Sequence, residues 1–80
     1  MNASTSVESI FIDVLNLTSP IDWNTVRYQE IEGWDSLAHM AIVGEMEDRL
    51  GVMLDPDDIV EMSSYERALE ILGKYGVEVA

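Results

Sequence analysis

The sequence contains no cysteine, only two prolines and only four basic residues among its 80. Without cysteine the chain can form neither disulfides nor thiolate metal sites, which fits a reducing cytosol. No apolar run approaches the length of a membrane span. Residues 1–6 lack the basic and apolar regions of a signal peptide. We therefore expect a cytoplasmic protein that does not enter a membrane.

The shortage of basic residues leaves a large excess of negative charge. Sixteen Asp and Glu residues face four Lys and Arg residues, for a formal net charge of −12. Such a surface repels nucleic acid and anionic membranes, because both are themselves negatively charged. It attracts proteins with basic patches and accelerates their encounter with the chain. We expect partners with basic docking surfaces, although the acids could instead serve only to keep a small protein soluble.

The length of the chain corresponds to one domain. With 48% hydrophobic residues it can form one small core, but a domain of this size buries only about 60% of its extended-chain surface. We predict a single domain over residues 1–80, with residues 1–4 and 76–80 loosely held. Because the chain begins with Met and ends soon after its last predicted helix, we expect a free-standing protein, and a monomer, rather than a module of a larger synthase.

Capping residues predict the first two helices. Thr5 and Glu8 form a capping box that starts a first helix ending near Leu17. Asp35 is a good N-cap for a second helix over residues 36–50, which ends at a glycine. Both segments have apolar residues at helical spacing.

A short third helix and a longer last helix follow. Asp55 caps the third helix with Pro56 at its first position, and its buried side is expected to hold Ile59, Val60 and Met62. Ser63 and Glu66 form a capping box for the last helix, whose apolar stripe consists of Tyr65, Ala68, Leu69 and Leu72. Because no convincing run of strands is present, we predict an all-α fold. It is a small four-helix bundle, three longer helices plus one short third helix, with a long connection between helices 1 and 2.

The connection over residues 18–34 is unusually long for a compact domain. It is not a solvated linker, because it carries Ile21, Trp23, Val26, Tyr28, Ile31 and Trp34. We expect these side chains to hold the segment across the helices, with one helical turn around residues 23–28. Its aromatic residues could instead line a ligand site.

The second helix has two apolar stripes rather than one. We assign one stripe to the core: His39, Ile42, Val43, Met46 and Leu50. The opposite stripe consists of Leu37, Met40, Ala41 and Gly44, flanked by Glu45, Glu47 and Asp48. Either the long connection covers this second stripe or it is a docking surface on which small residues admit close approach and methionine adapts to its partner.

Ser36 is the central candidate for chemistry. As the first residue of the second helix, it displays a primary alcohol at the positive end of the helix, where a phosphate group is electrostatically favoured. An ordinary helix-start serine is the structural alternative. A Ser36–His39 nucleophile is a weaker alternative, because nothing in the sequence identifies the donors that would hold an oxyanion.

The acidic group of Asp55, Asp57 and Asp58 does not match a calcium loop. Pro56 occupies the second position and Val60 stands where the loop needs a glycine. We interpret these acids as caps and surface, and predict no metal site.

The triplet Asp35-Ser36-Leu37, together with the Gly-Trp pair before it, resembles the attachment motif of the acyl and peptidyl carrier proteins. The resemblance extends over roughly residues 7–75. It implies a four-helix bundle and a 4′-phosphopantetheine group, derived from coenzyme A, joined to Ser36 through a phosphodiester. The terminal thiol of that group carries an acyl group as a thioester, so the protein is a carrier rather than an enzyme. Asp35 and Leu37 complete the attachment motif.

The resemblance also implies partners. In this family the second helix is recognised by the phosphopantetheinyl transferase, by acyl- or aminoacyl-activating enzymes and by synthases. The expected partner-binding residues are Met40, Ala41, Gly44, Glu47, Asp48, Ile59 and Val60. Ala41 and Gly44 stand where many fatty-acid carriers have an acid and a larger apolar residue, and Trp23, Trp34 and His39 are also unlike those carriers. A carrier dedicated to a polyketide, an amino acid, or a modified surface sugar or lipid therefore stands as an equal alternative to a housekeeping fatty-acid carrier. We expect an acyl carrier protein. The alternatives are an aminoacyl or peptidyl carrier, and an acidic helical adaptor without a prosthetic group.

Overall fold

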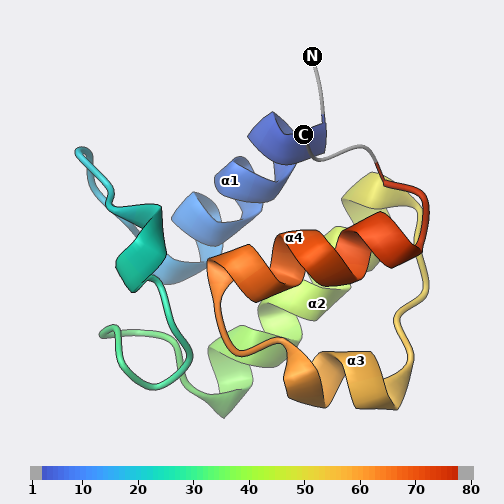
Figure 1. Cartoon of the computed structure of the whole chain (residues 1–80). Coiled ribbons are helices and arrows are strands. Elements are labelled where there is room, and N and C mark those ends of the chain that lie inside the picture. Colours follow the sequence, from blue (N-terminus) through green and yellow to red (C-terminus); the bar gives the residue numbers. More distant parts are fainter. Residues whose placement is uncertain (1–2, 78–80) are drawn as a thin grey trace.

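The chain folds as four α-helices joined by one long and two short connections (Figure 1). The computed structural model describes residues 3–77, with side chains from Ser6 onward. Its elements are α1 (Ala3–Leu15), the 3₁₀ turn η1 (Trp23–Thr25), α2 (Ser36–Leu50), α3 (Pro56–Glu61) and α4 (Tyr65–Lys74). The described residues contain no strand beyond an isolated bridge between Arg27 and Ser64. The predicted all-α bundle with a short third helix is confirmed.

Helix α1 ends earlier than predicted. Asn16 adopts a left-handed backbone conformation with φ 58°, and the Leu17 amide donates to the carbonyl of Ile12 at 3.2 Å. This arrangement terminates a helix, and asparagine tolerates it better than most residues. The helix begins at Ala3, so the predicted cap at Thr5 is wrong: Thr5 lies within the helix.

The described ends of the chain belong to the fold. Ala3 and Ser4 are part of α1, and Val77 packs against the core while its amide donates to the carbonyl of Leu72 at 3.2 Å. Residues 1–2 and 78–80, also predicted to be loosely held, lie outside the described residues. Within residues 3–77 no helix combines the length and the apolar character needed to cross a bilayer.

Two predictions about α3 and α4 are corrected. Val60 was expected on the buried side of α3 but is 82% exposed, and Asp58 is buried in its place. Helix α4 is capped by Ser64 rather than Ser63, because the Ser64 hydroxyl accepts from the Arg67 amide at 3.0 Å. The core stripe of α4 also includes Ile71, which the predicted stripe omitted although it lies three residues after Ala68.

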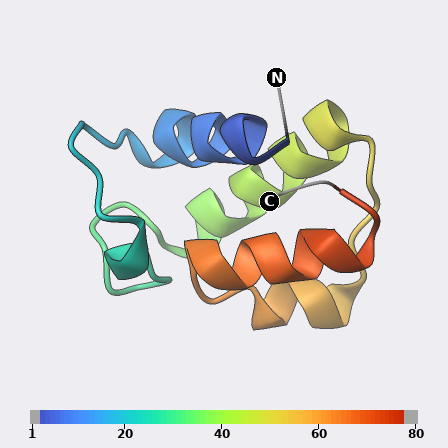
Figure 2. The same ribbon diagram turned by 45° about the horizontal axis from the view of Figure 1, so that its top comes forward.

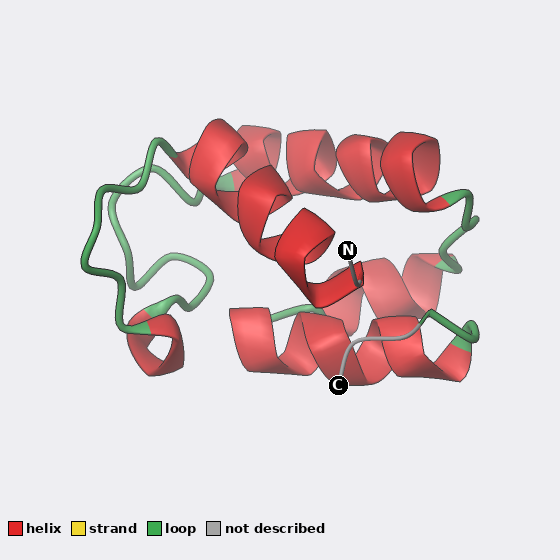
Figure 3. Cartoon of the chain, turned by 90° about the horizontal axis from the view of Figure 1, so that it is seen from above, coloured by secondary structure: helices red, strands yellow, loops and turns green. Residues whose placement is uncertain are grey.

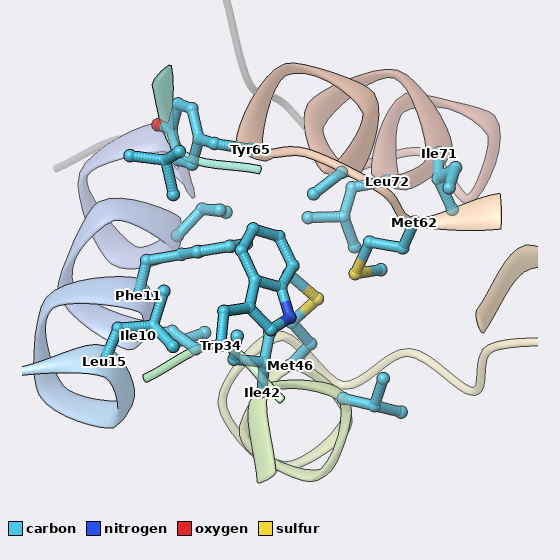
Figure 4. Packing of buried hydrophobic residues seen from close by; sticks show 14 of the residues in the cluster. Ile10, Phe11, Leu15, Trp34, Ile42, Met46, Met62, Tyr65, Ile71 and Leu72 are labelled. Atoms are coloured by element: carbon cyan, nitrogen blue, oxygen red, sulfur yellow. The ribbon is translucent and has the colours of Figure 1, made fainter. Parts of the chain in front are cut away.

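The core lies between α1, α2 and α4. Figure 2 shows α2 between α1 on one side and the α3–α4 pair on the other. In Figure 4 the Trp34 indole occupies the middle, beside Phe11 of α1 and near Ile42 and Met46 of α2. The Trp34 side chain is 1% exposed, and its ring meets that of Phe11 edge-to-face at 5.2 Å. A residue of the connection therefore fills the centre of the bundle.

The connection itself folds back at one end of the helices (Figure 3). Its backbone is joined to the start of α4, because the Tyr65 amide donates to Val26 and the Tyr28 amide donates to Ser63, both at 2.9 Å. Trp23 in η1 packs on Tyr65 with ring centroids 4.2 Å apart. The predictions of a pinned connection and of a helical turn near residues 23–28 are confirmed.

A polar tie joins α3 to the end of α4. The Asp58 carboxylate accepts from Lys74 Nζ at 2.6 Å and from the Tyr75 phenol at 2.5 Å. The same phenol oxygen accepts from the amide of Asp55 at 3.0 Å, whose carboxylate makes no capping hydrogen bond. The bonds from Lys74 and then Tyr75 hold the pKa of Asp58 below its ordinary value.

This tie is expected to make stability depend on pH in the acid range. Asp58 has a lowered pKa in the folded state, so its contribution is complete above the ordinary carboxyl value of 3.8 and is lost as pH falls through the lowered value. The wild type should exceed Asp58→Asn in free energy of unfolding at neutral pH, and this difference should shrink as the pH falls below about 4. Urea denaturation at a series of pH values measures it.

Asp57→Asn is the matched control, because it removes the same charge at an exposed position in the same helical turn. If the free energies of unfolding of the wild type and Asp58→Asn differed by the same amount across the acid range, the ionised Asp58 carboxylate would not contribute to stability.

Candidate functional site

The start of α2 is built as the sequence predicts. Gly33 has φ 93°, a conformation that glycine adopts readily and that turns the chain so that Trp34 enters the core. Asp35 then caps the helix, because its Oδ1 accepts from the Ala38 amide at 2.9 Å. Ser36 follows as the first helical residue and is exposed.

The Ser36 hydroxyl faces a phenol from the connection. Ser36 Oγ lies 3.1 Å from Tyr28 Oη, in a hydrogen bond for which either oxygen can be the donor. Next to it, Leu37 is 83% exposed. A surface hollow of about 510 Å³ lies on the preceding side of Asp35 and is lined by residues 29, 31 and 33–35. The hydroxyl therefore stands at the surface, with one defined neighbour.

Tyr28 belongs to an aromatic cluster that also contains Trp34 and His39. Its ring lies 5.1 Å from the His39 ring and 6.0 Å from the Trp34 ring, between centroids. From the sequence, Tyr28 was expected to pack the connection against the helices, with a ligand site lined by the aromatic residues as the alternative. No local spacing signals its position beside Ser36, because the two residues meet through a loop held by the core.

His39 has both ring nitrogens in hydrogen bonds. Its Nδ1 accepts from Trp34 Nε1 at 3.0 Å, and its Nε2 lies 2.7 Å from the carbonyl oxygen of Ile59. The indole can only donate and the carbonyl can only accept, so the imidazole is neutral with its proton on Nε2. The predicted assignment of His39 to the core stripe is confirmed by its 9% exposure.

The same bonds disfavour a Ser36–His39 nucleophile. A general base needs a nitrogen lone pair directed at the hydroxyl that it deprotonates. The lone pair of His39 is occupied by the Trp34 indole, and the hydrogen bond of Ser36 goes to Tyr28. The arrangement is that of a structural histidine.

The second apolar stripe of α2 is not covered by the connection. Leu37, Met40, Ala41 and Gly44 are all exposed, with Met40 at 54%. A Cβ atom added to Gly44 would meet nothing within 4 Å. Of the two interpretations of this stripe, the one in which the long connection covers it is therefore wrong.

The remaining predicted partner residues have different surroundings. Glu47 is engaged within the chain, because its Oε2 accepts from the Leu54 amide at 3.1 Å. Asp48 is exposed, Ile59 is half-buried and Val60 is exposed. Met53, in the α2–α3 loop, is 82% exposed and was not anticipated.

A protein-family model described as a phosphopantetheine attachment site matches residues 5–72. The chain belongs to this family. No curated protein and no solved structure matches it. Members of the family carry a covalently attached 4′-phosphopantetheine group, are not themselves catalysts, and interact with phosphopantetheinyl transferases and acyl-handling enzymes. This chain is therefore a carrier protein with a phosphopantetheine arm.

The position of His39 in the carrier can be tested by stability. His39→Leu would leave the buried indole N–H of Trp34 and the carbonyl of Ile59 without their partner, and each unsatisfied buried group costs about 1–3 kcal/mol. We expect the free energy of unfolding to fall by roughly 2–3 kcal/mol, measured by urea denaturation.

Met40→Ala is the control on the same helix, and its exposed position should keep the change within about 0.5 kcal/mol. If His39→Leu were as stable as Met40→Ala, the hydrogen-bonded chain through His39 would contribute nothing to folding.

Proposed function

We propose that the chain is an acyl carrier protein in which Ser36 bears the phosphopantetheine arm. The arm would hold acyl intermediates as thioesters and present them to enzymes of fatty-acid, polyketide or other specialised biosynthesis in the cytoplasm. The observation that carries the proposal is the exposed hydroxyl of Ser36 at the first position of α2.

The surroundings of Ser36 suit a phosphodiester. The free amides and the dipole at the start of α2 favour a negative group there. The one adjacent acid, Asp35, has its Oδ1 directed to the Ala38 amide in the first turn. Tyr28 supplies a phenol O–H beside the attachment oxygen.

Attachment requires a simple displacement at this hydroxyl. Ser36 Oγ would form a bond to the phosphorus of coenzyme A that bears the pantetheine. The bond from that phosphorus to the rest of the nucleotide would break, and adenosine 3′,5′-bisphosphate would leave. The Ser36 proton would pass to a base on the transferase. The carrier needs no catalytic group of its own for this step.

The exposed stripe of α2 supports a docking role. Met40, Ala41 and Gly44 offer an adaptable, low-profile apolar surface, and Asp48 adds negative charge at its side. On the neighbouring short helix, Ile59 and Val60 extend the proposed surface. A net charge of −12 favours partners with basic patches, such as the transferase, an acyl-activating enzyme and a synthase.

Attachment at Ser36 is tested by intact mass. Incubation of the chain with coenzyme A and a broad-specificity phosphopantetheinyl transferase should add the mass of one arm to the wild type and none to Ser36→Ala. Ser6→Ala, a serine on α1, is the matched control and should gain the arm normally.

An unchanged wild-type mass, together with tight binding to a basic protein, would favour the acidic adaptor instead. Labelling of Ser36 by a serine-directed phosphonate would favour a hydrolase. Loading of the attached arm by an amino-acid-activating enzyme, and not by an acyl-activating one, would identify an aminoacyl carrier.

The docking surface is tested by reversing one charge on it. Asp48→Lys should raise the KM of the transferase about fivefold at low salt, equivalent to about 1 kcal/mol for one exposed ion pair. The difference should shrink as salt is added, because exposed charges are screened over about 10 Å at 0.1 M ionic strength. Steady-state kinetics at several salt concentrations measure it.

Glu66→Lys makes the same charge change on α4, where Glu66 is exposed, and should leave KM close to that of the wild type. Equal effects of the two variants would indicate attraction by net charge alone rather than docking on α2.

A further inference from the structure

The ring of Tyr28 is held in place by contacts that do not involve Ser36. The Tyr28 amide donates to the carbonyl of Ser63 at 2.9 Å, and its ring is packed against Trp34 and His39. Trp34 and His39 are in turn hydrogen-bonded to each other at 3.0 Å inside the core. The phenol is thus presented by the folded core, and Ser36 Oγ, 3.1 Å away, meets it from α2.

Modification of Ser36 changes the hydrogen-bonding roles at this contact. While Ser36 is unmodified, either Ser36 Oγ or Tyr28 Oη can donate this hydrogen bond. Once Ser36 Oγ is esterified it has no proton, and every oxygen of the phosphodiester can only accept. A phenol O–H can still donate, and a hydrogen bond to an ionised acceptor is shorter and about twice as strong as a neutral one.

Most basic residues of the described chain are already engaged elsewhere. Arg49 pairs with Glu45 and Asp13, Arg67 with Glu61 and Glu70, and Lys74 with Asp58. Arg27, the remaining basic residue, is exposed and is next to Tyr28 in the sequence, so it is the cationic alternative as a partner for the phosphate.

We propose that Tyr28 is a positioning residue for the prosthetic group: its phenol O–H donates a hydrogen bond to the phosphodiester at Ser36 and sets the direction in which the arm leaves α2. This inference rests on the proposed attachment at Ser36. The donor stabilises one orientation of the phosphate relative to the connection, so the arm begins from a defined point rather than from a freely rotating ester.

The test is phosphorus-31 NMR of the holo protein. The native wild type should show its phosphodiester resonance displaced from the position found in the same holo protein unfolded in urea. Tyr28→Phe keeps the ring and loses the donor, so most of this displacement should be lost and the resonance should narrow. Tyr65→Phe, which removes a phenol from α4 in the core, and Arg27→Gln should both keep the wild-type displacement.

Two results would overturn the proposal: a Tyr28→Phe spectrum identical to that of the wild type, or a loss of displacement in Arg27→Gln instead. Intact mass of each sample separates these results from failure of attachment itself, since a wild type that gains no arm overturns both this inference and the proposed function.

Amide spectra check that Tyr28→Phe is folded. If it is not, the wild-type chain grown with fluorotyrosine, a stronger phenolic donor, replaces it. The phosphorus displacement should then increase, and an unchanged displacement would overturn the proposal.

Discussion

The hydrogen-bonded chain from the Trp34 indole through the His39 ring to the Ile59 carbonyl joins the connection, α2 and α3. Each group in it has one role, because the indole only donates and the carbonyl only accepts. The polar atoms of a buried Trp–His pair are therefore satisfied without water, and the two rings stack with centroids 5.9 Å apart. The fold depends on these two hydrogen bonds, because a six-residue helix such as α3 has little stability of its own and must be held by its neighbours.

The same constraint shapes the surface around Ser36. With Trp34 drawn into the core and Asp35 turned to the Ala38 amide, the next residue must begin the helix at the surface. His39, one turn later, lies inside and fixes which side of α2 is buried. The opposite side, with Met40 and Gly44, is left to solvent. An apolar stripe that the domain does not cover thus follows from how the core is filled.

Sequence reasoning found the features that depend on nearby residues. The Asp35 cap, the glycine end of α2 at Gly51 and the turn near Trp23 each follow from local backbone chemistry, and the structure has them. Two of the errors displaced the end or the cap of a helix by one or two residues. Helix α1 ends at Leu15, before the left-handed Asn16, rather than near Leu17, and Ser64 rather than Ser63 caps α4.

What could not be predicted depends on contacts between distant segments. Val60 appeared apolar enough for the core, but the inward position on α3 is taken by Asp58, whose charge is met by Lys74 from the end of α4. The meeting of Tyr28 with Ser36 likewise exists only after the connection has folded onto α4. Periodicity describes one segment at a time and contains no information on such pairs.

Gly44 is a position at which the stability of α2 and the shape of its exposed surface favour different residues. Glycine inside a helix costs about 1 kcal/mol relative to alanine, and a side chain here would meet nothing within 4 Å. The packing within the described chain therefore gives no reason for the missing methyl group. Its absence exposes a stretch of bare helical backbone, so that an approaching molecule can come nearer to the axis of α2 than any side chain would permit.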